Sequence, residues 1–117
     1  MNDINLMNKA ADNIRILAAS MVEKAKSGHP GGAMGGADFV NVLFSEFLVY
    51  DPKNPTWEGR DRYFQDPGHM SPMLYSVLAL TGKFTIDELK EFRQWGSVTP
   101  GHPEVNVMRG IENTSGP

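Results

Sequence analysis

Glycine and proline gather around each of the three histidines in this chain, and this pattern limits the fold more than any other feature. The three motifs are Ser27-Gly28-His29-Pro30-Gly31, Pro67-Gly68-His69-Met70 and Pro100-Gly101-His102-Pro103-Glu104. Because glycine and proline interrupt helices and strands, each histidine is predicted to lie in a turn. Loops that carry chemistry are usually held between rigid elements. Three imidazoles on three such loops therefore indicate a site assembled from distant parts of the chain.

The composition is that of one soluble globular domain, or part of one. The chain has 117 residues, of which 40% are hydrophobic and 21% are charged, and its net charge is -3. So small a charge, without a basic cluster, predicts neither a nucleic-acid partner nor an anionic membrane partner. No signal peptide or membrane-spanning run is recognisable. Cysteine is absent, which excludes disulfides and thiolate metal sites and favours a cytoplasmic location.

The first segment carries a pattern that predicts a long helix over residues 4–25. Its apolar residues recur at spacings that alternate between three and four: Ile4, Met7, Ala11, Ile14, Ala18, Met21 and Ala25. Asp3 is a suitable N-cap, and Gly28 follows the last turn, where a left-handed residue is favoured. We interpret the apolar stripe as a core face.

The rest of the chain alternates between predicted elements and loops. Residues 27–36 contain five glycines but match neither a dinucleotide-binding motif nor a P-loop, so a tight loop is expected. Residues 39–49 are apolar nearly all round, which favours a buried helix, with a strand as the alternative. The further predictions are a brief strand at 62–65, a helix at 71–81, a helix at 85–95 that opens with a capping box, and a loop at 97–117 with one candidate strand at 105–108.

Three imidazoles on separate loops permit three interpretations. Histidine titrates near neutral pH and can donate, accept or shuttle a proton, so the three rings could line one polar pocket. They could instead hold zinc, although their separations are long and no H-x-x-x-H pair exists. Each could also only cap a turn, and the residues alone leave this alternative open. Nucleophilic catalysis is less supported, because no G-x-S-x-G motif occurs.

Several ordered motifs resemble those of the transketolase family and cover nearly the whole chain. The segment from Ser27 to Gly31, followed by Met34-Gly35, is similar to the N-terminal signature of that family. The later matches follow in the family's order: Asp51-Pro52-Lys53-Asn54-Pro55, Arg60-Asp61-Arg62, Gly68-His69, Leu80-Thr81-Gly82, Thr99-Pro100-Gly101-His102-Pro103-Glu104 and Thr114-Ser115-Gly116-Pro117. The resemblance implies an α/β fold, with residues 1–117 as the incomplete N-terminal part of a thiamine diphosphate-binding domain. This part should be mostly helical, with one or two short strands.

The resemblance also implies an activity. Transketolases use thiamine diphosphate and a divalent cation to transfer a two-carbon ketol unit from a ketose phosphate to an aldose phosphate. The complete protein is therefore expected to be a homodimeric transferase of the pentose phosphate pathway. Its cation is expected to be Mg²⁺ or Ca²⁺. The remainder of the transketolase chain, or a C-terminal subunit, would be the partner of this segment.

The resemblance assigns roles to individual residues. It implies that His29 faces the substrate and assists proton movement at a hydroxyl or carbonyl oxygen. His69 is expected to contact the cofactor near its diphosphate, and His102 to bond the terminal hydroxyl of the donor. The backbone of Gly116, with Pro117 beside it, is expected to lie against the cofactor's ring system.

The chain departs from the family pattern in two respects. Asp66-Pro67 stands where many relatives carry small or amide residues before the Gly-His pair. The family's G-D-G…N segment, which binds the cation and the diphosphate, does not occur in these 117 residues. Because a diphosphate without its cation is poorly neutralised, we expect the chain alone to be inactive and to bind the cofactor weakly or not at all. The alternative is a stand-alone binding module, or a split-gene subunit that docks on a partner chain.

Overall fold

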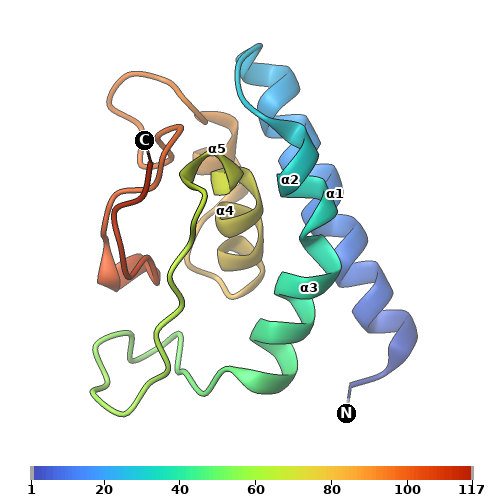
Figure 1. Ribbon diagram of the computed structural model, residues 1–117, viewed down its shortest axis with the longest axis vertical. Coiled ribbons are helices and arrows are strands. Elements are labelled where there is room, and N and C mark those ends of the chain that lie inside the picture. Colours follow the sequence, from blue (N-terminus) through green and yellow to red (C-terminus); the bar gives the residue numbers. More distant parts are fainter. Residues whose placement is uncertain (1, 117) are drawn as a thin grey trace.

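The computed structural model describes residues 2–116, and in this range it is built mainly from helices (Figure 1). The shorter helices pack on one side of a long helix, and an irregular C-terminal segment lies on the side of the molecule opposite the long helix. The elements are α1 (Ile4–Ala25), α2 (Pro30–Gly35), α3 (Ala37–Val42), the π-helical turn η1 (Leu43–Phe47), the 3₁₀ turn η2 (Gly68–Met70), α4 (Ser71–Leu80), α5 (Ile86–Lys90) and the 3₁₀ turn η3 (Val107–Arg109). No helix in residues 2–116 is long and apolar enough to cross a membrane.

Helix α1 confirms the prediction made from its apolar spacing. The carboxylate of Asp3 accepts a hydrogen bond from the peptide N–H of Leu6 at 3.0 Å, which satisfies one of the free donors at the start of the helix. The predicted C-terminal residue was wrong. The left-handed residue that ends α1 is Lys26, with φ 51°, whereas Gly28 lies beyond the cap. The helix therefore ends before the glycine, and a lysine takes the left-handed conformation.

The glycine-rich segment is helical from Pro30 to Gly35, so the prediction of a loop over residues 27–36 is correct for residues 27–29 but wrong for residues 30–35. Pro30 occupies the first turn of α2, where its missing N–H removes no hydrogen bond. Gly36 then allows a close approach to α4, because a β-carbon there would lie only 2.6 Å from the sulfur of Met73. Small residues thus let α2 and α3 pack against α4.

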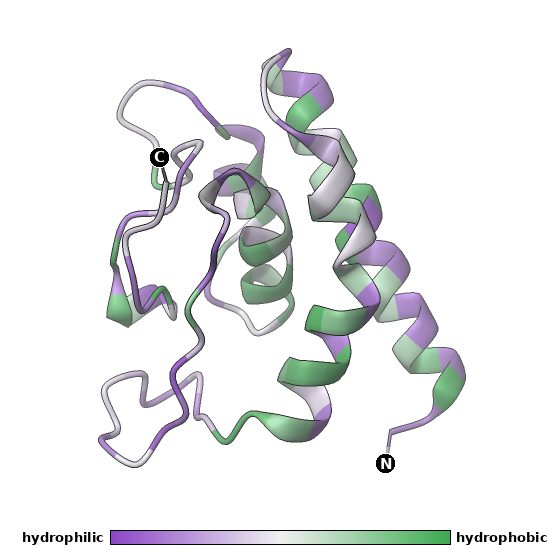
Figure 2. Ribbon diagram, in the orientation of Figure 1, coloured by the Kyte–Doolittle hydropathy of each residue, from purple (hydrophilic) through white to green (hydrophobic). Residues whose placement is uncertain are grey.

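The apolar segment at 39–49 is helical only as far as Phe47, and the strand alternative is wrong. It is also less buried than predicted. Val40 and Phe44 face the core, whereas Phe39 and Phe47 are 65% and 70% exposed. Figure 2 shows that hydrophobic residues are frequent along α3 and η1 as well as along α4. A face of this kind is typical of a surface that meets another part of a protein.

Helix α4 confirms its prediction and lies at the centre of the molecule, where it packs against α1, α2, α3 and α5. Its residues from Ser71 to Leu78 are all buried. Tyr75 is fully buried and contacts the rings of Phe84 and Phe92 at centroid distances of 5.4 and 6.2 Å. Burial of large aromatic side chains of this kind is a major source of stability. The helix therefore gives a rigid base to the loop that precedes it.

Helix α5 has the predicted capping box but is shorter than predicted. The Thr85 hydroxyl accepts from the N–H of Glu88, and the Glu88 carboxylate accepts from the N–H of Thr85, at 3.2 and 2.9 Å. The helix ends at Lys90, not at Trp95. Arg93 adopts a left-handed φ of 61°, which a helix cannot continue through.

The two predicted strands, at 62–65 and 105–108, were wrong. Residues 61–66 are extended but have no strand partner in the described range. Instead, the side-chain amide of Asn113 accepts from the N–H of Gln65 at 3.0 Å and donates to its carbonyl at 3.3 Å. Near 105–108 the structure has only an isolated antiparallel bridge between Asn106 and Ile111, followed by the turn η3. Side-chain hydrogen bonds thus replace a β-ladder here.

Candidate active site at the histidine loops

His29 and His69 lie against each other, although forty residues separate them. Their ring centroids are 4.7 Å apart and the ring planes are inclined by 49°. His29 is the residue just before α2, in an extended conformation, and His69 lies in η2, directly before α4. Each ring is therefore held at the start of a helix. The packing of α2 against η2 and α4 brings the two rings together.

The segment ending at Gly116 passes beside the His69 loop. A β-carbon at Gly68 would lie 2.7 Å from the carbonyl of Ser115 and 2.8 Å from Cα of Gly116, so only glycine permits this approach. The Ser115 hydroxyl also donates to the carboxylate of Asp66 at 3.2 Å. The backbone of residues 115–116 is thereby held against Gly68, the residue that precedes His69.

His102 lies on the other side of the same segment. A β-carbon at Gly116 would lie 2.8 Å from Nδ1 of His102, and the N–H of Ser115 donates to the carbonyl of Pro103 at 3.1 Å. An open cavity borders this contact and is lined by Asp66 and by residues 102–104 and 113–116. The structure therefore brings His29 and His69 into ring contact and sets His102 against the neighbouring Gly116 backbone.

Two hydroxyl groups of α4 anchor the His102 loop. Ser71 donates to the carbonyl of Gly101, and Tyr75 donates to the carbonyl of Pro100, each at 2.6 Å. Burial raises the pKa of the Tyr75 phenol, and the charge of Glu104 adds to this effect. The phenol therefore stays protonated and keeps its hydrogen bond throughout the physiological pH range. Since α4 also follows directly on η2, the turn that contains His69, one helix positions two of the three histidine loops.

The histidines do not form a metal site with each other in the part of the chain that the structure describes. No group of three or more His, Cys, Asp or Glu side chains in residues 2–116 could hold a metal ion. The zinc interpretation therefore gains no support from the geometry. Pro117, the remaining predicted site residue, lies outside the described residues.

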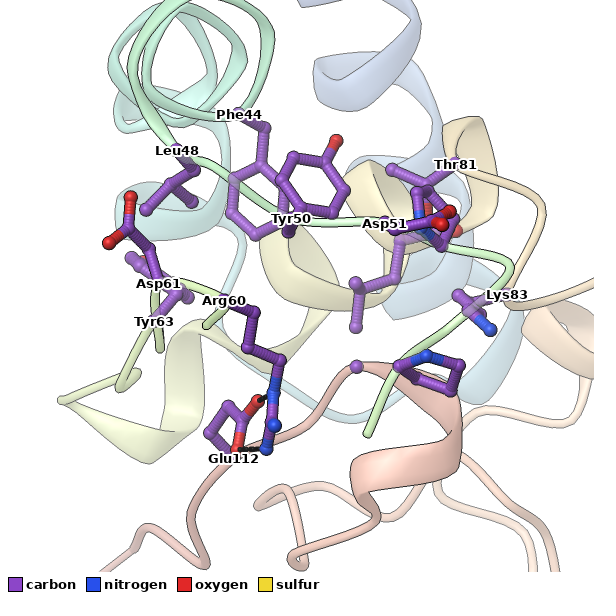
Figure 3. Close-up of a pocket in the computed structure, with 14 residues that line it drawn as sticks. Phe44, Leu48, Tyr50, Asp51, Arg60, Asp61, Tyr63, Thr81, Lys83 and Glu112 are labelled. Atoms are coloured by element: carbon purple, nitrogen blue, oxygen red, sulfur yellow. Dashed lines mark hydrogen bonds and ion pairs between the residues drawn. The ribbon is translucent and has the colours of Figure 1, made fainter. Parts of the chain in front are cut away.

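A separate pocket that the sequence did not reveal lies between η1, residues 50–63 and the C-terminal segment (Figure 3). Phe44, Tyr50 and Tyr63 form its aromatic wall. At its edge Arg60 and Glu112 make a bidentate ion pair, with Nε–Oε1 at 2.6 Å and Nη2–Oε2 at 3.0 Å. Both side chains are only 8% exposed, and Glu112 raises the pKa of Arg60. None of the three histidines lines this pocket, so we treat the ion pair as a structural clamp between distant segments.

Comparison with known proteins identifies the family. The model of a family described as "Transketolase, thiamine diphosphate binding domain" matches residues 6–117. The transketolase of Buchnera aphidicola subsp. Baizongia pistaciae is 53% identical over 113 residues, covering 96% of this chain and 17% of the relative. Transketolase 1 of Escherichia coli is 52% identical over 108 residues, covering 92% of this chain and 16% of the relative.

Solved structures give the same result. The transketolase of Campylobacter jejuni superposes with a TM-score of 0.92 at 47% identity, over 99% of this chain and 18% of the matched chain. A Pichia stipitis transketolase in complex with sedoheptulose-7-phosphate superposes with a TM-score of 0.90 at 44% identity, over 95% and 16%. This chain thus spans about one sixth of the length of these relatives. It belongs to the transketolase family and corresponds to part of the thiamine diphosphate-binding domain of that family.

Proposed function

We propose that this chain is the N-terminal part of a transketolase that transfers a two-carbon ketol unit from a ketose phosphate to an aldose phosphate. Family membership and the meeting of three histidine loops support the proposal. Related structures from Pichia stipitis are complexes with sedoheptulose-7-phosphate, fructose-6-phosphate and xylulose-5-phosphate, which favours ketose phosphates as donors here. The contact between His29 and His69 is the observation that supports the proposal most strongly, because it brings together two imidazole rings that lie far apart in the sequence.

The residues around Gly116 fit a flat cofactor such as thiamine diphosphate. Glycine at 68 and 116 lets the backbone of residues 115–116 pack closely between the His69 and His102 loops, and the open cavity lined by Asp66, residues 102–104 and residues 113–116 lies beside that backbone. When bound, thiamine diphosphate supplies a nucleophilic carbon and an electron sink for cleaving the bond next to a ketone. In this proposal the Gly116 backbone lies against the cofactor's rings. Pro117 is assigned to the same contact, although it lies outside the described residues.

His69 is proposed to bond the diphosphate of the cofactor. It lies two residues before α4, whose N-terminal end carries the positive part of the helix dipole and has no side-chain cap. An imidazole N–H and this partial charge both favour an anion at the same place. We assign the Mg²⁺ or Ca²⁺ ion, which would neutralise the diphosphate, to ligands in the rest of the protein.

His29 and His102 are proposed to act on the sugar. An imidazole can donate a proton to a developing alkoxide and take it back at neutral pH, so His29 would move the proton at the substrate's hydroxyl or carbonyl oxygen. His102 would hydrogen-bond the terminal hydroxyl of the donor and orient it. This division assigns the chemical step to one ring and donor binding to the other.

The partners of this segment are proposed to be the rest of the transketolase chain and a second subunit. Exposed apolar side chains on α3 and η1, including Phe39 and Phe47, would be covered in that assembly. The absence of cysteine agrees with a cytoplasmic enzyme of the pentose phosphate pathway.

A direct assay tests the proposal. The complete reading frame that contains this sequence is expressed and assayed with xylulose 5-phosphate and ribose 5-phosphate, in the presence of thiamine diphosphate and Mg²⁺. Formation of sedoheptulose 7-phosphate is expected, and His29→Ala should reduce kcat by about 10²- to 10⁴-fold. Absence of ketol transfer by the wild-type protein would contradict the proposed function.

A further inference from the structure

Arg93 has a conformation that its own residue type does not favour. Its φ is 61°, in the left-handed region that side chains other than those of Gly, Asn and Asp rarely adopt. The N–H of Arg93 donates to the carbonyl of Thr99 at 3.1 Å, so the turn that follows α5 closes on this residue. A conformation of this kind persists only when its surroundings hold it, and it is most frequent at functional sites.

The guanidinium of Arg93 lies between the His29 loop and the His102 loop. Its Nη1 donates to the hydroxyl of Ser27 at 3.0 Å, two residues before His29. On its other side, a β-carbon at Gly101 would lie 2.7 Å from Nε and 2.9 Å from Cζ, one residue before His102. The guanidinium therefore fills the space between two segments that are far apart in the sequence.

Charge pairing does not explain this placement. In residues 2–116 no carboxylate forms an ion pair with Arg93, and its Nε is buried without a hydrogen-bond partner. Its Cζ instead lies 5.7 Å from the centroid of the Phe92 ring, and a β-carbon at Gly28 would lie 3.6 Å from Nε. The contacts depend on the flat shape of the guanidinium, which lysine does not share.

The geometry points to Arg93 as a positioning residue that sets the separation between the His29 and His102 loops. This inference rests on the proposed function, in which both histidines act on one ketose donor. Ser71 and Tyr75 already hold the His102 loop from the side of α4. Arg93 holds it from the side of the His29 loop, so both imidazoles reach the same substrate. Arg93 acts through these loops and does not itself touch the donor.

Steady-state kinetics of the complete enzyme test the role. Arg93→Lys and Arg93→Gln should both reduce kcat/KM for the ketose donor by about 100-fold, because a displacement of about 1 Å is enough for such a loss. The control is Arg15→Lys, which makes the same exchange on α1, where Arg15 forms a surface ion pair with Asp38 of α3. This variant should leave kcat/KM unchanged. Wild-type kinetics in Arg93→Lys would show that the shape of the side chain is not required.

A double-mutant cycle separates positioning from general stability. If Arg93 acts through His102, Arg93→Lys should reduce kcat/KM by less than about threefold when His102→Ala is already present, because residues that share one interaction are not additive. Equal losses in both backgrounds would overturn the inference. Gly101→Ala approaches the same contact from the other side. It should reproduce the donor defect in a protein that keeps Arg93, and normal donor kinetics in this variant would count against the inference.

A crystal structure of the complete Arg93→Lys protein gives a readout that does not need turnover. The loops around Ser27 and Gly101 should be displaced relative to α4, whereas the His69 turn should keep its position. Loops at their wild-type separation would overturn the role of Arg93 even in an active enzyme. A wild-type protein without ketol transfer would instead contradict the proposed function, so the two failures are distinguishable.

Discussion

Gly68 illustrates how one missing side chain shapes the site. The carbonyl of Ser115 occupies the place that a β-carbon of residue 68 would take. Contact with main-chain atoms cannot be relieved by a change of rotamer. The neighbouring His69 therefore depends on glycine for its position beside residues 115–116. The sequence indicated that this glycine belongs to a turn, but the segment it contacts lies almost fifty residues away and no local pattern reveals it.

Gly68→Ala should destabilise the complete protein by about 1–3 kcal/mol, the usual effect of overpacking. The added methyl group must push the Ser115 backbone away, so the apparent Kd for thiamine diphosphate should also rise. Urea unfolding and cofactor titration measure the two effects. Gly35→Ala is the matched control, because a β-carbon there meets nothing within 4 Å and α2 gains helix propensity. Equal stability of the two variants would refute the explanation.

At the scale of elements, predictions succeeded where a local pattern decides the structure. The apolar spacing of α1 and the capping box of α5 act within one or two turns of helix, and both are present. The strand predicted at 62–65 failed because a strand needs a ladder partner, and here the Asn113 side chain satisfies Gln65 instead. Of the site, the turns around the histidines were predictable. The contact of Arg93 with two loops was not, because it depends on tertiary packing.

Loss of the capping box should weaken α5 and the turn that carries Arg93. Thr85→Ala removes the acceptor for the N–H of Glu88 and should reduce the free energy of unfolding by about 1 kcal/mol. Thr85→Ser keeps a hydroxyl at the cap and should retain most of this stability. Chemical denaturation of the complete protein compares the two variants. A serine variant as unstable as the alanine variant would argue against the hydrogen bond as the cause.

The link between α5 and η3 should depend on pH. Hydrogen bonds from Arg109, and then from the Thr85 backbone, lower the pKa of Glu88 to about 2 from its usual value near 4.5. Because the folded-state pKa is lowered, this stabilisation is complete above about pH 5 and is lost as the pH falls toward 2. Glu88→Gln should therefore have a shallower decline of the unfolding midpoint between pH 5 and pH 3. A decline as steep as that of the wild type would contradict this assignment.

At the scale of the whole molecule, we propose that the segment presents a cofactor-facing edge but not a complete binding site. The histidine loops and the glycine backbone converge, while the family's cation-binding G-D-G…N segment is not among these 117 residues. The exposed apolar residues on α3 and η1 are proposed to be the surface that the remaining structure covers. The fold of this part is therefore best understood as one wall of a larger site.

The 117-residue segment alone should bind thiamine diphosphate and Mg²⁺ weakly or not at all, and should have no ketol transfer activity. The diphosphate charge would lack the ligands that hold its cation. Isothermal titration of the isolated segment and of the complete protein provides the comparison. Tight, saturable binding by the segment would show that its own loops are sufficient for cofactor binding.

The most direct measurement is a crystal structure of the complete protein with thiamine diphosphate and a divalent cation. The account predicts that His69 contacts the diphosphate, that the Gly116 backbone lies against the cofactor's rings, and that His29 and His102 face one cavity above the reactive carbon. A cofactor bound away from these loops, with the three imidazoles directed into separate regions, would contradict the account.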